Sequence, residues 1–173
     1  METHATADQL VLDTIHTGLT VSSLDDAIAF WCDVIGCRLD VRKKLASGPA
    51  LDSIVGVPGT ELEIAVVVAP GGHKIELLQY DKPDDRTIYR PRSCDVGSAH
   101  LTFSVSDIDK LLDRVESAGW NRLGAPQTYP NGMRVAYARG PEGHRTIGKI
   151  CCETLPDWTW DAFFANVIST YRV

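Results

Sequence analysis

Two histidines, His16 and His100, open two similar stretches of the chain. Residues 16–26 read HTGLTVSSLDD, and residues 100–110 read HLTFSVSDIDK. The match indicates an internal duplication in which each histidine begins a short strand and a helix start signal follows. If the two copies pack about a pseudo-twofold axis, matched side chains approach that axis. We therefore expect both imidazoles to line one shared concavity.

A carboxylate, Glu76, is the third candidate. It lies in a strand pattern, KIELLQY at 74–80, and is bracketed by Ile75 and Leu77. A carboxylate in such apolar surroundings is better explained by a role inside a cleft than by a solvated surface position. Two imidazoles and one carboxylate, with open positions left over, suit a divalent first-row metal used as a Lewis acid or for oxygen activation. Taken singly, each of the three could equally be a structural or solvated side chain.

The hydrophobic pattern predicts the elements that position these residues. The first copy is predicted to hold a helix between Ser22 or Ser23 and Gly36, a loop over 48–59, and strands over 11–21, 37–44, 61–69 and 73–80. The second is predicted to hold a helix over 108–118 and strands over 101–105, 122–129, 133–139 and 145–152. An aromatic, amphipathic segment predicts a further C-terminal helix over 157–172. The pattern is that of a single α+β domain, 1–173, made of two βαβββ modules over 11–80 and 98–152.

Composition excludes several classes of function. The 173-residue chain carries a net charge of −6 and a pI near 5.3, whereas nucleic-acid binding needs a clustered basic face. No apolar run approaches the roughly 20 residues of a membrane helix. The polar, acidic opening lacks a secretory signal, and the five cysteines show no CxxC spacing. These features predict a cytoplasmic protein that binds neither nucleic acid nor membrane.

Four motifs resemble the vicinal oxygen chelate superfamily. They are HxxLTVSxL at 16–24, the Gly-Cys that ends the first helix, KIELL at 74–78 and AHLxFxVxDI at 99–108. That superfamily includes glyoxalase I, methylmalonyl-CoA epimerase, extradiol dioxygenases, and fosfomycin and bleomycin resistance proteins. The resemblance implies that the paired modules form a curled mixed sheet around a metal-binding cleft. It also implies that the leading histidine and the last-strand glutamate of each module hold the metal.

Carried over residue by residue, the resemblance places metal ligands at His16, Glu76 and His100. The fourth ligand falls on Ile147, which cannot bind a metal, and His144, Tyr137 and Glu153 remain as imperfect substitutes. We therefore favour three protein ligands. This 2-His-1-carboxylate arrangement suits Fe(II), Mn(II) or Co(II), and Ni or Zn also stay open as the divalent ion.

For the reaction, the resemblance implies enediolate chemistry stabilised by the metal, in an isomerase, epimerase or lyase of the glyoxalase type. The substrate would be a small oxygen-bearing carbonyl compound, and Glu76, Tyr137 and His144 are the candidates for moving its proton. The missing second glutamate leaves an Fe(II)-dependent, ring-cleaving or related dioxygenase as the alternative, because substrate and oxygen can fill the open positions. A non-catalytic binding or resistance protein is the third possibility. By analogy with relatives we expect a homodimer.

Overall fold

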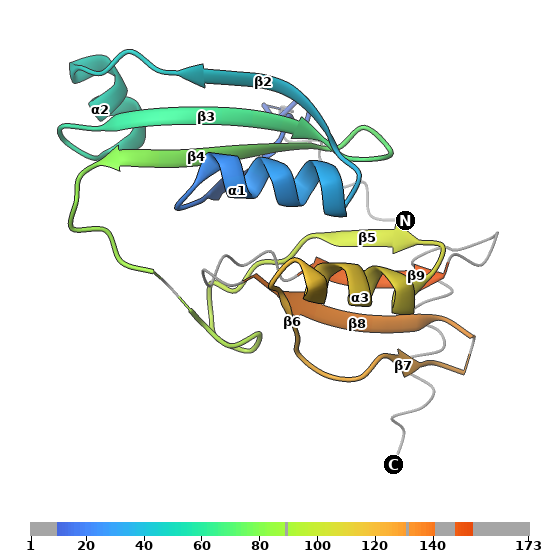
Figure 1. Cartoon of the computed structure of the whole chain (residues 1–173). Helices are drawn as coiled ribbons and strands as arrows, with labels where there is room; N and C mark the ends of the chain where they lie inside the picture. Colours follow the sequence, from blue (N-terminus) through green and yellow to red (C-terminus); the bar gives the residue numbers. More distant parts are fainter. Residues whose placement is uncertain (1–9, 89, 131, 141–147, 154–173) are drawn as a thin grey trace, which may run out of the picture.

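The computed structural model describes residues 10–88, 90–130, 132–140 and 148–153 (Figure 1). It confirms the predicted α+β class and contains the duplicated plan. The first module consists of β1 (Thr17–Thr20), α1 (Leu24–Ala29), the π-helical turn η1 (Phe30–Val34), β2 (Arg38–Lys44), α2 (Pro49–Val55), β3 (Glu61–Val68) and β4 (Lys74–Lys82). The second consists of β5 (Thr102–Val105), α3 (Ile108–Ser117), β6 (Asn121–Arg122), β7 (Gln127–Thr128), β8 (Arg134–Arg139) and β9 (Gly148–Glu153).

Each module forms its own mixed sheet with the same strand order. The first-module sheet runs β1-β4-β3-β2, and the second-module sheet runs β5-β9-β8-β6, with β7 added against β8. The first strand of each module is parallel to the last one, and the remaining pairs are antiparallel. Among the described strands, β1 and β5 therefore each have one unpaired edge.

The helix start is also repeated. The side chain of Ser23 accepts a hydrogen bond from the backbone N–H of Asp26, and the side chain of Asp107 accepts one from Lys110. Such N-caps satisfy a backbone donor that the first helical turn leaves free. The matched caps fix the same strand-to-helix turn in both modules.

The two modules join through their helix-covered faces. One hydrophobic core unites Leu24 and Ile75 of the first module with Ile108, Leu112 and Ala138 of the second. The rings of Phe30 and Trp120 stack across this junction, with centroids 3.9 Å apart and planes 7° from parallel. We call the side of each sheet away from this core its open face.

Several predicted boundaries were wrong. The strand over 11–21 is only Thr17–Thr20 long, and its register with β4 begins with Thr17 opposite Ile75. The loop over 48–59 contains α2, since Pro49 occupies the first helical turn and Gly56 (φ 71°) closes the last one.

The second module also differs from the predicted elements. The strand over 122–129 is divided into β6 and β7. The helix predicted over 157–172 lies outside the described residues. None of the helices in the described part of the chain has the length and hydropathy needed to cross a bilayer.

Candidate functional site

His16 and Glu76 meet on the open face of the first-module sheet. Nε2 of His16 lies 3.2 Å from Oε2 of Glu76, and the side chains are 42% and 22% exposed. His16 directly precedes β1, and Glu76 lies in β4, the strand that pairs with β1. The flanking Ile75 and Leu77 are fully buried in the core, so strand alternation turns Glu76 to the opposite side. Two donors of the kinds that bind first-row metals are thus held together and reachable from solvent.

Gly18 leaves room beside this pair. It is the register partner of Glu76, and a Cβ built on it would lie 4.0 Å from Glu76 Oε2 and 3.5 Å from Leu78 Cδ1. Because Gly18 has no side chain, the carboxylate is approachable from the β1 side. A ligand or a metal ion could use that space.

The side chain of Gln79 links the helix of the first module to the strand that contains Glu76 through a hydrogen bond. Its Oε1 accepts a 2.7 Å hydrogen bond from the backbone N–H of Leu24, the first residue of α1, and its Nε2 donates to Asp81 Oδ1 at 2.9 Å. The hydrogen bond from Gln79, together with the ion pair to Lys44, lowers the pKa of Asp81. The start of α1 is therefore fixed relative to β4, which limits how far the Glu76 backbone can shift.

His100 lies on the second module, beside Tyr137. The two rings have centroids 5.9 Å apart and meet edge to face, with 69° between their planes. Ala136 and Ala138 of β8 are in the core, so Tyr137 points to the open face of the second-module sheet. The structure thus brings together two of the sequence-predicted residues here, as it does with His16 and Glu76 in the first module.

The four residues form two separate pairs. The open faces that carry them lie on the far sides of the core that joins the modules. Across the described residues, no three His, Cys, Asp or Glu side chains lie close enough together to hold a metal ion. The donor chemistry of His16 and Glu76 fits a divalent cation, but a third protein ligand has to come from outside this pair.

The strand register assigns the fourth ligand position differently from the sequence match. In the first module Glu76 pairs with Gly18, two residues after His16. In the second, Lys149 of β9 pairs with Thr102, two residues after His100, and on its other side with Tyr137. Lys149 is therefore the register counterpart of Glu76, whereas the sequence match had pointed to Ile147, which lies outside the described residues.

The catalytic candidate His144 also lies outside the described residues, but its counterpart in the first module is described. His73 follows the turn before β4, and its Nε2 lies 3.0 Å from Oγ1 of Thr17. This contact links the turn to the beginning of β1, next to His16. In the first module, then, the turn histidine supports the strand that leads from the site.

Arg139 adds a positive charge to the second module, and it was missed in the sequence. It lies two residues after Tyr137 in β8, so both belong to the same face. Its Nη2 donates a 2.9 Å hydrogen bond to the carbonyl of Pro91, while its Nε is buried and has no hydrogen-bond partner among the described residues. No carboxylate pairs with it in the part of the chain that the structure describes.

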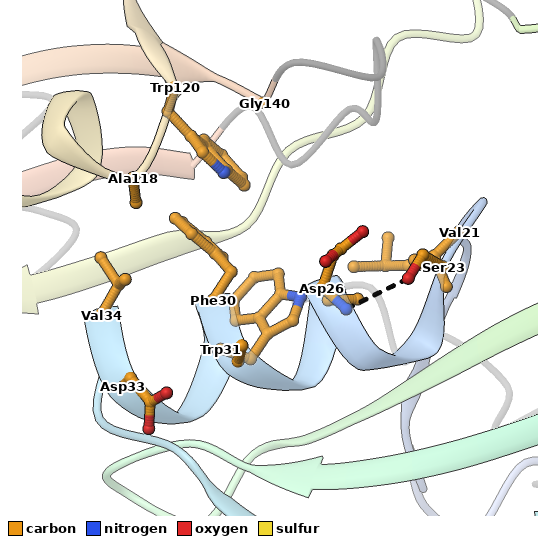
Figure 2. A pocket seen from close by; sticks show the side chains of 13 residues that line it. Val21, Ser23, Asp26, Phe30, Trp31, Asp33, Val34, Ala118, Trp120 and Gly140 are labelled. Carbon is orange, nitrogen blue, oxygen red and sulfur yellow. Dashed lines mark hydrogen bonds between the residues drawn. The ribbon is translucent and has the colours of Figure 1, made fainter.

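A cavity of about 410 Å³ lies at the junction of the modules, away from both pairs (Figure 2). Phe30, Trp31 and Val34 line it from the first module, and Ala118, Trp120 and Gly140 line it from the second. Gly140 packs closely against Trp120 there, because a Cβ would lie 3.1 Å from two atoms of the Trp120 ring. None of the predicted metal ligands lines this cavity, so we assign it to the packing of the modules.

Known proteins resemble the chain over most of its length. A family model described as Glyoxalase/Bleomycin resistance protein/Dioxygenase superfamily matches residues 14–146. A 2-epi-5-epi-valiolone epimerase from Actinomyces sp. is 32% identical over 120 residues, which are 68% of this chain and 65% of the epimerase. A probable lactoylglutathione lyase from Synechocystis sp. is 27% identical over 132 residues, 76% of this chain and 89% of the lyase. The chain thus spans about two thirds of the length of the epimerase.

Solved structures agree on the fold. A glyoxalase family protein from Bacillus cereus is 32% identical, with a TM-score of 0.73 over 81% of this chain and 94% of its own. A glyoxalase I from Zea mays has a TM-score of 0.59 and is 18% identical, over 82% of this chain and 44% of its own. At that lower identity the likeness supports the architecture alone.

Proposed function

The chain belongs to the Glyoxalase/Bleomycin resistance protein/Dioxygenase superfamily, and we propose that it is a divalent-metal-dependent isomerase, epimerase or lyase of that superfamily. Its substrate would be a small oxygen-bearing carbonyl compound. The observation that carries the proposal is the 3.2 Å approach of His16 Nε2 to Glu76 Oε2 on an open sheet face. The similarity to an epimerase and to a probable lactoylglutathione lyase supports the reaction class.

His16, Glu76 and His100 would hold the metal ion. A divalent ion bound there would act as a Lewis acid toward substrate oxygens. Glu76 is partly exposed and within reach of a ligand in the space beside Gly18, so its carboxylate is our candidate for moving a substrate proton. Tyr137 would orient the His100 ring, with which it makes an edge-to-face contact.

A second copy of the chain would complete the site. His16 and Glu76 are on one open face, and His100 is on the other module, across the shared core. In a C₂ dimer, a contact between one surface of a copy and a different surface of its partner is repeated with the roles exchanged, so the first module of each copy can face the second module of the other. The unpaired edges of β1 and β5, and the exposed apolar side chains of Leu10, Val11, Leu12 and Ile15 before β1, offer surface for that contact.

Metal binding tests the site directly. We would remove metal from the purified protein and titrate Co(II), Mn(II), Ni(II), Zn(II) and, without oxygen, Fe(II) by calorimetry. Wild type should bind about one ion per chain, and His16→Ala, Glu76→Gln and His100→Ala should each weaken binding roughly tenfold or more. Asp40→Asn is the matched control, because this exposed carboxylate lies in β2, at the opposite edge of the sheet from β1, and its loss should leave the affinity unchanged. Full affinity in all three site variants would contradict the proposal.

Activity assays separate the reaction classes. The protein would be tested with 2-oxo and 2-hydroxy carbonyl compounds, including a valiolone epimer and S-lactoylglutathione, which the names of the two relatives suggest. We expect turnover that chelator abolishes, that added metal restores and that consumes no oxygen. Oxygen uptake with a catechol would favour the dioxygenase alternative. Tight ligand binding that survives the double change of His16 and His100 to alanine would favour a non-catalytic binding protein.

A further inference from the structure

Aliphatic side chains lie beside Glu76 on the open face of the first-module sheet. In one cross-strand row, Glu76 of β4 pairs with Val66 of β3, which pairs with Val41 of β2. In the next row, Leu78 of β4 pairs with Ile64 of β3. Residues paired directly across neighbouring strands share a face, and residues two apart on one strand do so too, so these four side chains lie on the face of Glu76. We call Val41, Ile64, Val66 and Leu78 the apolar floor.

The apolar floor does not take part in joining the modules. None of its four residues belongs to the described core between the modules, and all four are half-buried or exposed. Uncovered aliphatic side chains that adjoin a polar functional group are typical of a ligand site. The floor is therefore apolar surface that a bound molecule can cover.

The size of the apolar floor favours a small molecule over a protein as the molecule that covers it. Its three strands span about 10 Å and its two rows about 7 Å along the strands, which gives roughly 70 Å². Lys43 of β2 ends the second row beside Ile64, so the apolar surface does not continue along that edge. Each partner in a stable protein interface buries about 800 Å². A hydrocarbon group of a substrate matches the floor much better.

The floor ends where β3 begins, next to α2 (Figure 1). The carboxylate of Asp52 in α2 accepts hydrogen bonds from the backbone N–H groups of Gly59 and Thr60, at 2.8 and 2.9 Å, which fixes α2 beside the start of β3. Leu62, two residues before Ile64 on the same strand face, is only 2% exposed and so offers no surface to a ligand. The floor is thus open beside Glu76 and closed at this end, which limits the length of a bound hydrocarbon chain.

We propose that the apolar floor binds a hydrocarbon group of the substrate, attached to the carbonyl group that reacts beside Glu76. A Cβ built on Gly18 would lie 3.5 Å from Leu78 Cδ1 and 4.0 Å from Glu76 Oε2, so the floor and the carboxylate border the same space. The preferred substrates are then carbonyl compounds with an aliphatic or aromatic substituent, in preference to polyhydroxylated ones. The inference rests on the proposed function for the reacting group, but binding of a hydrocarbon to the floor can be measured without metal.

The first experiment uses hydroxamates as probes, because their two oxygens chelate a metal ion while the attached carbon chain can be varied. Calorimetry on the full-length, Co(II)-loaded protein would compare acetohydroxamate, hexanohydroxamate and gluconohydroxamate, in which hydroxyl groups cover the six-carbon chain. Wild type should bind hexanohydroxamate roughly tenfold more tightly than either of the others, because its chain covers the floor. Equal affinity for hexanohydroxamate and acetohydroxamate would overturn the proposal.

Variants of the floor test whether this preference arises there. Val41→Thr and Val66→Thr keep the branched shape but add a hydroxyl group, and each should reduce the preference for hexanohydroxamate over acetohydroxamate roughly threefold or more. Leu39→Thr is the matched control. Leu39 is as exposed as Val41, 41% against 42%, but it pairs with Val67 on the helix-covered face, so its change should leave the preference as in wild type. No reduction in the two valine variants, or an equal one in Leu39→Thr, would overturn the assignment.

The second experiment tests the floor without metal, by NMR of methyl-labelled protein. Hexanohydroxamate added to the metal-free protein should shift the methyl resonances of the apolar floor and not those of Leu39. If the floor responds but the protein binds no Co(II), the metal-dependent function fails and the hydrocarbon site stands. Floor resonances that change with protein concentration and not with hexanohydroxamate would show that a second copy covers the floor, and would overturn the proposal. Floor resonances that respond to neither would overturn it as well.

Discussion

Nε2 of His16 lies 3.2 Å from Oε2 of Glu76, although 60 positions of sequence numbering separate the two residues. The parallel pairing of β1 with β4 produces this contact, by aligning Gly18 with Glu76. The equivalent pairing of β5 with β9 aligns Thr102 with Lys149. The same backbone plan therefore aligns a glutamate with the first strand of one module and a lysine with the first strand of the other.

A complementation experiment tests whether His16 and Glu76 of one copy share a metal site with His100 of a second copy. His16→Ala and His100→Ala proteins should each be inactive and bind metal weakly. Unfolding, mixing and refolding the two in equal amounts should restore about one quarter of the wild-type sites, because half of the dimers are mixed and each mixed dimer has one intact site.

The control mixture pairs His16→Ala with Glu76→Gln. Both changes alter the first module, so every copy in the mixture lacks an intact His16–Glu76 pair. No intact site can form, and no recovery is expected. Recovery in the control, or its absence in the first mixture when mixed dimers are shown to be present, would refute a shared site.

Substitution of Gly18 should impair the site without unfolding the chain. Gly18→Leu would place a branched side chain next to Glu76 Oε2, which lies 4.0 Å from the position of a Cβ. We expect Co(II) affinity to fall roughly tenfold, with Gly18→Ala close to wild type. Calorimetry measures the affinity, and Thr20→Leu, on the same strand face two residues further on, serves as the control.

Gly140→Ala should destabilise the junction of the modules. The added Cβ would lie 3.1 Å from two Trp120 atoms, and overpacking of this kind costs about 1–3 kcal/mol. Chemical denaturation followed by tryptophan fluorescence gives the free energy of unfolding. Gly124→Ala is the matched control, since nothing lies within 4 Å of its Cβ position. An equal effect of the two changes would show that Trp120 does not confine Gly140.

The ion pair between Asp109 and Arg134 should contribute to stability in a pH-dependent way. Both guanidinium nitrogens Nη1 and Nη2 of Arg134 donate to the carboxylate, at 2.7 and 2.9 Å, and these hydrogen bonds lower the pKa of Asp109. Because the folded-state pKa is the lower one, the stabilisation is present above the unfolded pKa of about 3.9 and is lost as pH falls through the folded value.

The melting temperature of wild type should therefore be higher than that of Arg134→Gln at about pH 6, and the two melting temperatures should converge as the pH falls below about 3. Lys110→Gln provides the comparison for loss of a positive charge without an ion pair. A difference in melting temperature between wild type and Arg134→Gln that stays constant over this pH range would contradict the explanation.

The sequence was sufficient to predict much of the fold. The repeat around His16 and His100, together with strand alternation, predicted the α+β class, and Ser23 as a helix start agrees with its N-cap in the structure. Gly and Pro around α2 were misread as a loop, because the same residues also begin and end short helices.

The site was harder to predict, because it depends on strand register and, as we propose, on assembly with a second copy. The match of Glu76 with Ile147 assumed equal spacing after the turn, whereas the pairing of β9 aligns Lys149, two residues later. The internal repeat also led us to expect both imidazoles in one shared concavity of a single chain. The shared core of Leu24 and Ile108 joins the helix-covered faces instead, which periodicity alone does not reveal.

That shared core also makes folding of the chain a separate process from completion of the site. Both modules can bury their apolar faces within one chain, so folding is a unimolecular process. If the site is completed by a second copy, as we propose, its formation is bimolecular. Dilution would then inactivate the enzyme while leaving each chain folded, and protein concentration would set the specific activity.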